Sequence, residues 1–148
     1  MFKHILLPTD GSSLSARGVK QTIRMAKALG AHITAVHVVR EYHVPEEEGY
    51  FMPDVVVVRK QFEDEAAAHA KEILGPVKEA ANKAGVDCDM VVTTGDSPYQ
   101  MIINQAKKSG CDLIMMASHG RRGLQRLLHG SETVSVLTHS KIPVLVLR

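Results

Sequence analysis

The stretch that decides the fold is FKHILLPTDGSSLSARGVKQTIRMAKALGAHITAVHVV, residues 2–39. Its first apolar run, FKHILL, is short and ends at a proline, which is typical of a buried strand. A helix follows that Ser12 or Ser13 can cap, with apolar residues three or four positions apart until Gly30. Residues 32–39 are rich in β-branched side chains and predict a second strand. The unit therefore reads as a strand, a crossover helix and a parallel strand.

The rest of the chain repeats this alternation. The run VVVV at 55–58 fits either a strand or the start of a helix, and Gly75-Pro76 interrupts the helical pattern that follows, which predicts a kink or two helices in succession. The apolar stripe of that pattern is Val58, Phe62, Ala66, Ala70, Ile73, Val77, Ala80 and Ala84. The remaining predicted elements are strands at 89–93, 112–117 and 144–147, a helix that Ser97 caps and Gly110 closes, and a helix from about 130 to 140.

This order predicts an α/β fold with a doubly wound, five-stranded parallel sheet. Several strands are apolar throughout, which indicates a sheet covered on both faces by helices. Right-handed crossovers make the fold doubly wound, and we predict the strand order 3-2-1-4-5. The length of 148 residues suits a single domain, residues 1–148, with a sizeable core.

Composition narrows the classes of function. A net charge of +2, no Trp and only six Phe and Tyr residues give no sign of a nucleic-acid partner. Cys88 and Cys111 have neither CxxC nor zinc-ligand spacing, which favours a structural role for both. The apolar run at the start is too short for a signal peptide or a membrane span, so we expect a cytoplasmic protein without a membrane partner.

Two polar loops are expected to meet at one crevice. In a sheet of this order, strands one and four are neighbours where the order reverses, and ligands bind beyond their carboxyl ends. The loops that leave these strands are PTDGSS and SHGRRG. Neither a Walker A loop nor the dinucleotide fingerprint GxGxxG occurs in them. What remains is a glycine at 120, nine residues, and then Gly130-Ser131 opening a helix, where free N–H groups favour anionic oxygens.

These residues resemble the universal stress proteins, specifically their nucleotide-binding branch. The family's motif is G-x-x-G, nine residues, then G-[ST], after the fourth strand. The chain has Ala117 to Gly120, nine residues, then Gly130-Ser131. The opening ILLPTDGS, the strand AVHVV and the final KIPVLVL extend the resemblance over essentially the whole chain. The resemblance implies a Rossmann-like fold of the adenine nucleotide alpha hydrolase type that binds ATP or AMP.

The resemblance also implies roles for individual residues. Asp10 would lie near the ribose or phosphates and is a candidate ligand for a Mg²⁺ ion that accompanies the nucleotide. Val38 would offer main-chain contacts to adenine, and Gly95 would lie near the base. Gly120 and Gly130 would let the phosphates approach, and Ser131 would hydrogen-bond them. The complete predicted nucleotide site is Pro8, Thr9, Asp10, Val38, Gly95, Ala117, His119, Gly120, Arg121, Gly123, Gly130, Ser131, Glu132 and Thr133.

Simpler roles compete with these. Asp10 could brace its turn, and Ser131 could only cap a helix. The arginines of the loop could be solvated. Ala117 replaces the first glycine of the motif, and its methyl group is expected to be tolerated if φ is negative there. A hydrolytic triad of His119 or His129 with Ser118 and Asp10 lacks a nucleophile elbow.

The leading hypothesis is an adenine-nucleotide-binding regulator or sensor of stress with at most slow ATP hydrolysis. The alternative is a dimeric interaction module of the same fold that does not bind nucleotide, for which Ala117 is the argument. The chain lacks the residue patterns that ATP pyrophosphatases, flavodoxins and receiver domains each require. In the resembling family the last strand forms a homodimer, and an apolar edge at Val144–Leu147 predicts the same here.

Overall fold

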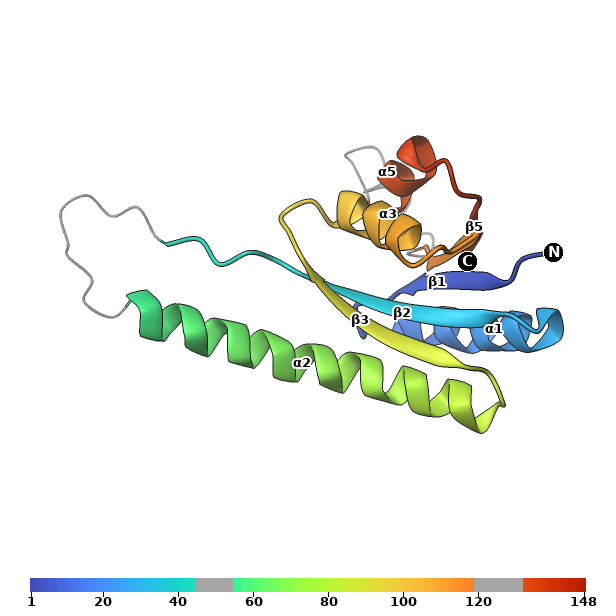
Figure 1. Cartoon of the computed structure of the whole chain (residues 1–148), viewed down its shortest axis with the longest axis horizontal. Helices are drawn as coiled ribbons and strands as arrows, with labels where there is room; N and C mark the ends of the chain where they lie inside the picture. Colours follow the sequence, from blue (N-terminus) through green and yellow to red (C-terminus); the bar gives the residue numbers. More distant parts are fainter. Residues whose placement is uncertain (45–54, 119–131) are drawn as a thin grey trace.

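The computed structural model describes residues 1–44, 55–118 and 132–148. They form a five-stranded parallel sheet in the order β3-β2-β1-β4-β5, which confirms the predicted fold and strand order (Figure 1). The strands are β1 (His4–Pro8), β2 (His32–Val39), β3 (Cys88–Thr94), β4 (Leu113–Ala117) and β5 (Val144–Leu147). The helices are α1 (Ser13–Leu29), α2 (Val55–Lys83), α3 (Pro98–Lys108) and α5 (Glu132–His139).

Helices cover both faces of the sheet, as expected for a doubly wound fold. On β1, Ile5 and Leu7 belong to a core cluster with side chains of α1 and α2, whereas Leu6 belongs to a second cluster with side chains of α3 and α5. Neighbouring residues of a strand point to opposite faces, so the three buried residues of this one strand supply both clusters. Figure 1 shows α1 and α2 on one side of the sheet and α3 and α5 on the other.

The first crossover is built as its sequence predicts. Ser12, rather than Ser13, is the N-cap of α1, and its side chain accepts a hydrogen bond from the Ser15 amide at 3.2 Å. Gly30 ends the helix with φ of 61°, in the left-handed region that favours glycine. The two caps bring β2 into parallel register with β1, where Ile5 is opposite Ile33.

The helix α2 corrects one expectation and resolves another. Residues 55–83 form one continuous helix with Pro76 inside it, so the chain does not divide into two helices at Gly75-Pro76 (Figure 1). The VVVV run is the start of this helix and not a strand. The helix survives the proline because its neighbours Leu74 and Val77 are buried against the sheet, which offsets the loss of one backbone hydrogen bond.

The predicted apolar stripe of α2 is buried only in part. The buried residues are Ala70, Leu74, Val77 and Ala81, while Ala80 is exposed. In the first half of the helix, Val58 and Phe62 are 42% and 36% exposed. Helical spacing predicts which residues share one face of the helix but not where the sheet ends. The first half of α2 extends beyond the core residues that could bury its apolar face.

Element ends differ from the predictions by one or two residues. The first strand is His4–Pro8 rather than 2–7, and β3 extends one residue beyond 89–93 at each end. Ser97 is the N-cap residue of α3 but makes no side-chain capping bond, and Ser109 rather than Gly110 is its C-cap. The last helix begins at Glu132 in the part of the chain that the structure describes, because residues 119–131 lie outside it.

Both cysteines are buried and unpaired, in agreement with a structural role. Burial raises the pKa of the Cys111 thiol to about 11 and also raises that of Cys88. Over the described ranges, no helix combines the length and apolar character that a membrane span requires.

Candidate functional site

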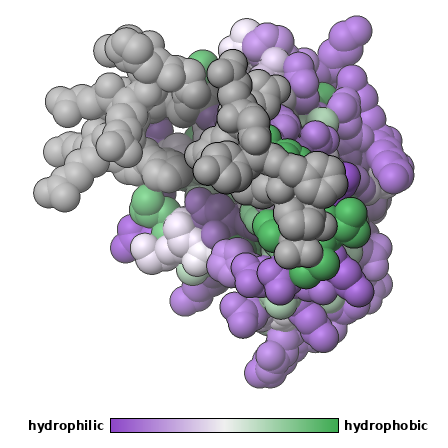
Figure 2. All heavy atoms as spheres, turned by 90° about the vertical axis from the view of Figure 1, so that its left-hand side faces the viewer, coloured by the Kyte–Doolittle hydropathy of each residue, from purple (hydrophilic) through white to green (hydrophobic). Residues whose placement is uncertain are grey.

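The crevice expected between strands one and four is present. β1 pairs with β4 in parallel, with Leu6 opposite Ile114, so the segments that follow the two strands leave from the same edge of the sheet. A cavity of about 400 Å³ lies there. Figure 2 faces this edge, where apolar side chains gather in patches on a mostly polar surface. The cavity is lined by Pro8, Thr9, Asp10, Ser12, Leu14, Ser15, Val36, His37, Val38, Arg40, Pro98, Ile102, Met116, Ala117, Glu132 and Thr133.

The turn after β1 forms the floor of the cavity and is held by its own side chains. The Thr9 hydroxyl is buried and hydrogen-bonds the hydroxyl of Ser15 on α1. Asp10 is exposed, and its carboxylate accepts a hydrogen bond of 2.9 Å from the Ser12 amide. The bracing role predicted as an alternative for Asp10 is therefore real. It leaves this carboxylate at the mouth of the cavity, where it can also meet a ligand.

The strand β2 supplies one wall and contains a residue that sequence reasoning missed. His37 lines the cavity, and its Nδ1 lies 2.9 Å from the Thr9 carbonyl oxygen. A carbonyl only accepts, so Nδ1 carries the proton and donates it. This bond ties β2 to the floor of the cavity. His37 has no metal-ligand or catalytic spacing to the other histidines, and only its place near the end of a strand beside the first loop could have indicated it.

The opposite wall joins the starts of α3 and α5. Glu132, the first residue of α5, accepts a hydrogen bond of 2.7 Å from the Tyr99 amide in the first turn of α3. Carboxylates stabilise helix N-termini in this way because the first amides have no partner within the helix. Glu132 and Thr133, both among the predicted site residues, line the cavity.

Ala117 lies at the cavity with its methyl group beside α1. A Cβ added at Gly18 would lie 3.0 Å from the Cβ of Ala117. The two positions therefore face each other where α1 packs on β4. Among the described residues only glycines have positive φ, so φ of Ala117 is negative. The condition for tolerating alanine at this place in the motif is therefore met.

The remaining predicted residues divide into two groups. Gly95 is not among the residues that line the cavity, and a Cβ there would come within 2.6 Å of the Met101 sulfur, so its small size serves the packing of α3. The other six, His119, Gly120, Arg121, Gly123, Gly130 and Ser131, lie outside the described residues. The structure thus brings together Pro8, Thr9, Asp10, Val38, Ala117, Glu132 and Thr133.

The charges of the described wall are mixed. Asp10 and Glu132 bring two carboxylates to the cavity and Arg40 brings one guanidinium. Arg40 follows β2 directly and was not predicted, because a single arginine after a strand has no distinctive pattern. The apolar part comes from Val36, Ile102 and Met116. An apolar interior with a few polar groups at its rim is typical of a small-molecule site.

Comparison with known proteins agrees with this architecture. The sequence model of the universal stress protein family matches residues 1–148. Universal stress protein YxiE of Bacillus subtilis is 33% identical over the full length of both chains. Universal stress protein MJ0531 of Methanocaldococcus jannaschii is 31% identical, covering all of this chain and 83% of its own.

Solved structures of full-length similarity show the same fold. The structure of hypothetical protein MJ0577 has a TM-score of 0.79 at 27% identity and covers 99% of this chain and 96% of its own. Universal stress protein UspA of Lactobacillus plantarum has a TM-score of 0.78 at 26% identity, with 99% and 98% covered. With the strand order, the crevice and the family match over its whole length, the chain belongs to the universal stress protein family.

Proposed function

We propose that the crevice binds an adenine nucleotide, ATP or AMP. The observation that carries the proposal is the cavity between the ends of β1 and β4, lined by the Thr9-Asp10 turn, by Val38 and by the first residues of α5. Its volume of about 400 Å³ lies in the usual range for small-molecule sites. Ala117, which ends β4, and Glu132, which begins α5, both line the cavity, so the described residues on either side of the motif lie at this place.

The walls suggest how the nucleotide would lie. The adenine would contact the main chain of Val38 and the apolar side chains of Val36 and Ile102. The phosphates would point toward the start of α5, whose amides favour anions. Gly120, Gly130 and Ser131 are the residues that we propose to contact them.

Magnesium fits this arrangement. The carboxylates of Asp10 and Glu132 would repel bare phosphates, and Glu132 already caps α3. Asp10 is exposed at the mouth of the cavity and has an oxygen chemistry that Mg²⁺ prefers, so we propose it as the ion's protein ligand. The ion would neutralise phosphate charge beside that carboxylate.

Binding, rather than rapid turnover, is the proposed activity. Among the described lining residues, His37 is the one imidazole, its Nδ1 donates to the Thr9 carbonyl, and no hydroxyl or thiol of the described residues donates to its ring. Hydrolysis would at most be slow, and occupancy by ATP or AMP would itself be the signal in a stress response.

From its family we further propose a cytoplasmic homodimer. Two structures of this fold are of universal stress proteins in complex with cAMP and with dAMP, at 24% and 17% identity.

Calorimetric titration with ATP and AMP, each with and without Mg²⁺, tests the proposal. We expect saturable binding with one site per chain, and tighter binding of ATP when Mg²⁺ is present. Nucleotide released from the denatured, freshly purified protein would support the same conclusion. Absence of saturable binding at millimolar nucleotide would contradict it and favour the dimeric interaction module.

A substitution in the motif tests the site itself. Gly130→Val should fill the space beside the phosphates and weaken binding by about tenfold or more, roughly 1.4 kcal/mol. Ala80→Val, on the exposed face of α2, is the matched control and should leave affinity unchanged. Circular dichroism checks that both variants fold. Equal affinity in a folded Gly130→Val variant would count against this site.

A further inference from the structure

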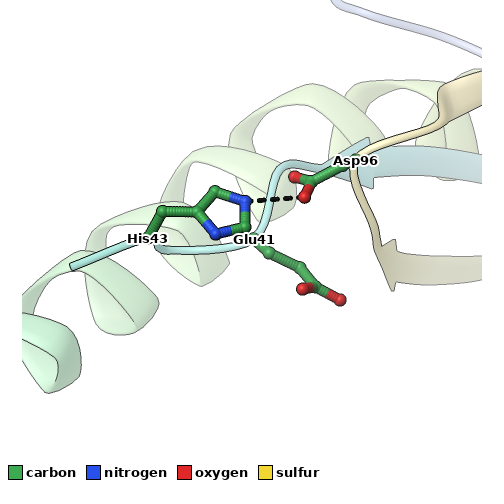
Figure 3. A group of neighbouring side chains, drawn as sticks. All are labelled: Glu41, His43 and Asp96. Carbon is green, nitrogen blue, oxygen red and sulfur yellow. Dashed lines mark hydrogen bonds and ion pairs between the residues drawn. The ribbon is translucent and has the colours of Figure 1, made fainter. Parts of the chain in front are cut away.

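Three metal-binding side chains gather outside the crevice, beyond the ends of β2 and β3. They are Glu41, His43 and Asp96, and one ligand atom from each lies within 4.8 Å of the other two. Figure 3 shows the ring of His43 and the carboxylate of Asp96 turned toward each other, with the Glu41 carboxylate beside them. His43 Nε2 and an Asp96 carboxylate oxygen are 2.6 Å apart. In the described part of the chain this is the one such group of three.

The sheet, and not chance proximity of loops, sets this arrangement. β2 and β3 are parallel and paired up to Val39 opposite Thr94. The Gly95 amide then donates to the Val39 carbonyl at 2.9 Å, which extends the pairing by one more bond. Glu41 and Asp96 each stand two residues beyond the last pair, so they occupy corresponding positions. His43 is two residues further on, and alternate residues of an extended chain point the same way.

The charges of the group favour a divalent cation. The two carboxylates give it a charge of −2 when the imidazole is neutral. The structure gives Glu41 no ion pair with Lys or Arg among the described residues, and the partner of Asp96 is His43. The side chains of His43 and Asp96 are 69% and 52% exposed, so an ion can reach them and water can complete its coordination.

The donor set selects the class of metal. An imidazole nitrogen with two carboxylate oxygens suits zinc and its neighbours in the first transition row better than Mg²⁺ or Ca²⁺, which prefer oxygen donors alone. Zinc binds such atoms at about 2.0–2.2 Å, so ligand atoms around it lie about 3–4 Å apart. The present spacing of up to 4.8 Å requires closure by about an ångström. Exposed side chains can make that movement by changing rotamer.

We propose that Glu41, His43 and Asp96 form a zinc site with three protein ligands and water in the remaining positions. His43 would bind through Nε2 in its neutral form and exchange its hydrogen bond with Asp96 for the metal. Because Glu41 and His43 follow β2 and Asp96 follows β3, the ion would join the two chain segments that leave the sheet here. The site is separate from the proposed nucleotide site and does not depend on it.

Titration of the full-length protein with Zn²⁺ against a chromophoric chelator tests the site. We expect that His43→Ala or Asp96→Asn removes one equivalent of bound Zn²⁺, or weakens it at least tenfold, and that Glu41→Gln weakens it less. His69→Ala is the matched control, because the His69 side chain is 67% exposed and has one carboxylate, Glu72, at 3.9 Å. It should bind Zn²⁺ like the wild type. Identical titrations of the His43→Ala and His69→Ala variants would overturn the proposal.

Cobalt provides a direct readout of coordination. With Co²⁺ in place of Zn²⁺, the wild type should develop visible d–d absorption that zinc abolishes and millimolar Mg²⁺ does not. The His43→Ala variant should lack this absorption although its circular dichroism is unchanged. Absorption of equal strength in both proteins, or loss of it on adding Mg²⁺, would show that these three residues do not form the site.

Discussion

At residue scale, the departure from the family motif is Ala117, which replaces its first glycine. Gly18 of α1 packs directly against it. The methyl group of Ala117 occupies the space that a side chain at position 18 would need. Sequence reasoning could identify the departure from the motif but not its partner, since 99 positions separate the two residues along the chain. A pair of this kind becomes visible only when the helix is placed on the sheet.

This pairing predicts a coupled effect on stability. Gly18→Ala alone should lose the gain of about 1 kcal/mol that alanine normally brings to a helix, because its methyl group meets that of Ala117. In an Ala117→Gly background the same change should be stabilising. Urea unfolding of the four proteins gives the coupling energy, which we expect to be about 1 kcal/mol or more. Additive effects would contradict the contact.

At element scale, local signals predicted the two ends of α1 well and the burial of α2 poorly. Ser12 and Gly30 act through bonds within their own turn, so the sequence was enough to identify them. The exposed Val58 and Phe62 depend on where the sheet stops, which no local pattern encodes. The unbroken passage of α2 through Pro76 has the same origin, because tertiary packing of its neighbours outweighs a local preference.

The proline in α2 predicts a stabilising substitution. Pro76 is exposed and cannot donate to the carbonyl one turn earlier. Pro76→Ala should raise the free energy of unfolding by about 1–3 kcal/mol, which is the difference in helix propensity reduced by the greater freedom of the unfolded chain. Urea unfolding measures the change. Gln61→Ala, at an exposed position of the same helix, should change stability by less than about 0.5 kcal/mol, and a Pro76→Ala variant that behaves likewise would disprove the argument.

At the scale of the whole molecule, the alternation of elements predicted a doubly wound parallel sheet, and the predicted strand order 3-2-1-4-5 led to the crevice between β1 and β4. Seven of the predicted site residues line the cavity because the fold brings the loops after β1 and β4 together. His37 and Arg40 were missed, since each contributes through its place at the end of β2 and not through a motif. The zinc-binding group was missed for a similar reason, because its register between two strands is set only in three dimensions.

The edge strand β5 predicts how two copies associate. Leu145 and Leu147 pack against one core cluster and Val144 against the other, while Val146 belongs to neither cluster of the described core. If the proposed homodimer forms through this edge, Val146→Glu should yield monomers in sedimentation equilibrium without unfolding the chain. Val92→Glu, on the opposite edge strand β3 where Val92 is 48% exposed, should leave a dimer. A monomeric wild type would refute the dimer.

The other end of the sheet predicts a dependence of stability on pH. Burial, together with the neighbouring His32, lowers the pKa of the His4 imidazole below its usual value of 6.5, although Asp112 and Asp89 oppose this. The folded protein therefore binds fewer protons at His4 than the unfolded chain does. The contribution of His4 to the free energy of unfolding is fully present above about pH 6.5. It is lost as the pH falls from there through the lowered pKa of the folded state.

Replacing this histidine should remove that part of the pH dependence. Between pH 7.5 and 5.5, the melting temperature of His4→Gln should fall less than that of the wild type, since glutamine stays neutral and can still hydrogen-bond Thr34, which His4 Nε2 contacts at 2.8 Å. Thermal unfolding at the two pH values measures the difference. The same fall in both proteins would show that other groups cause it.

The contact between Gly18 and Ala117 also has a consequence for how the family can evolve. A chain that keeps glycine at the start of the nucleotide motif gains helix stability from alanine in the first helix, whereas a chain with alanine in the motif loses that gain. The two positions should therefore covary among relatives, with at most one methyl group between them. The residue at position 18 of the first helix would then indicate whether the motif begins with glycine or alanine, although that helix contains no residue of the motif.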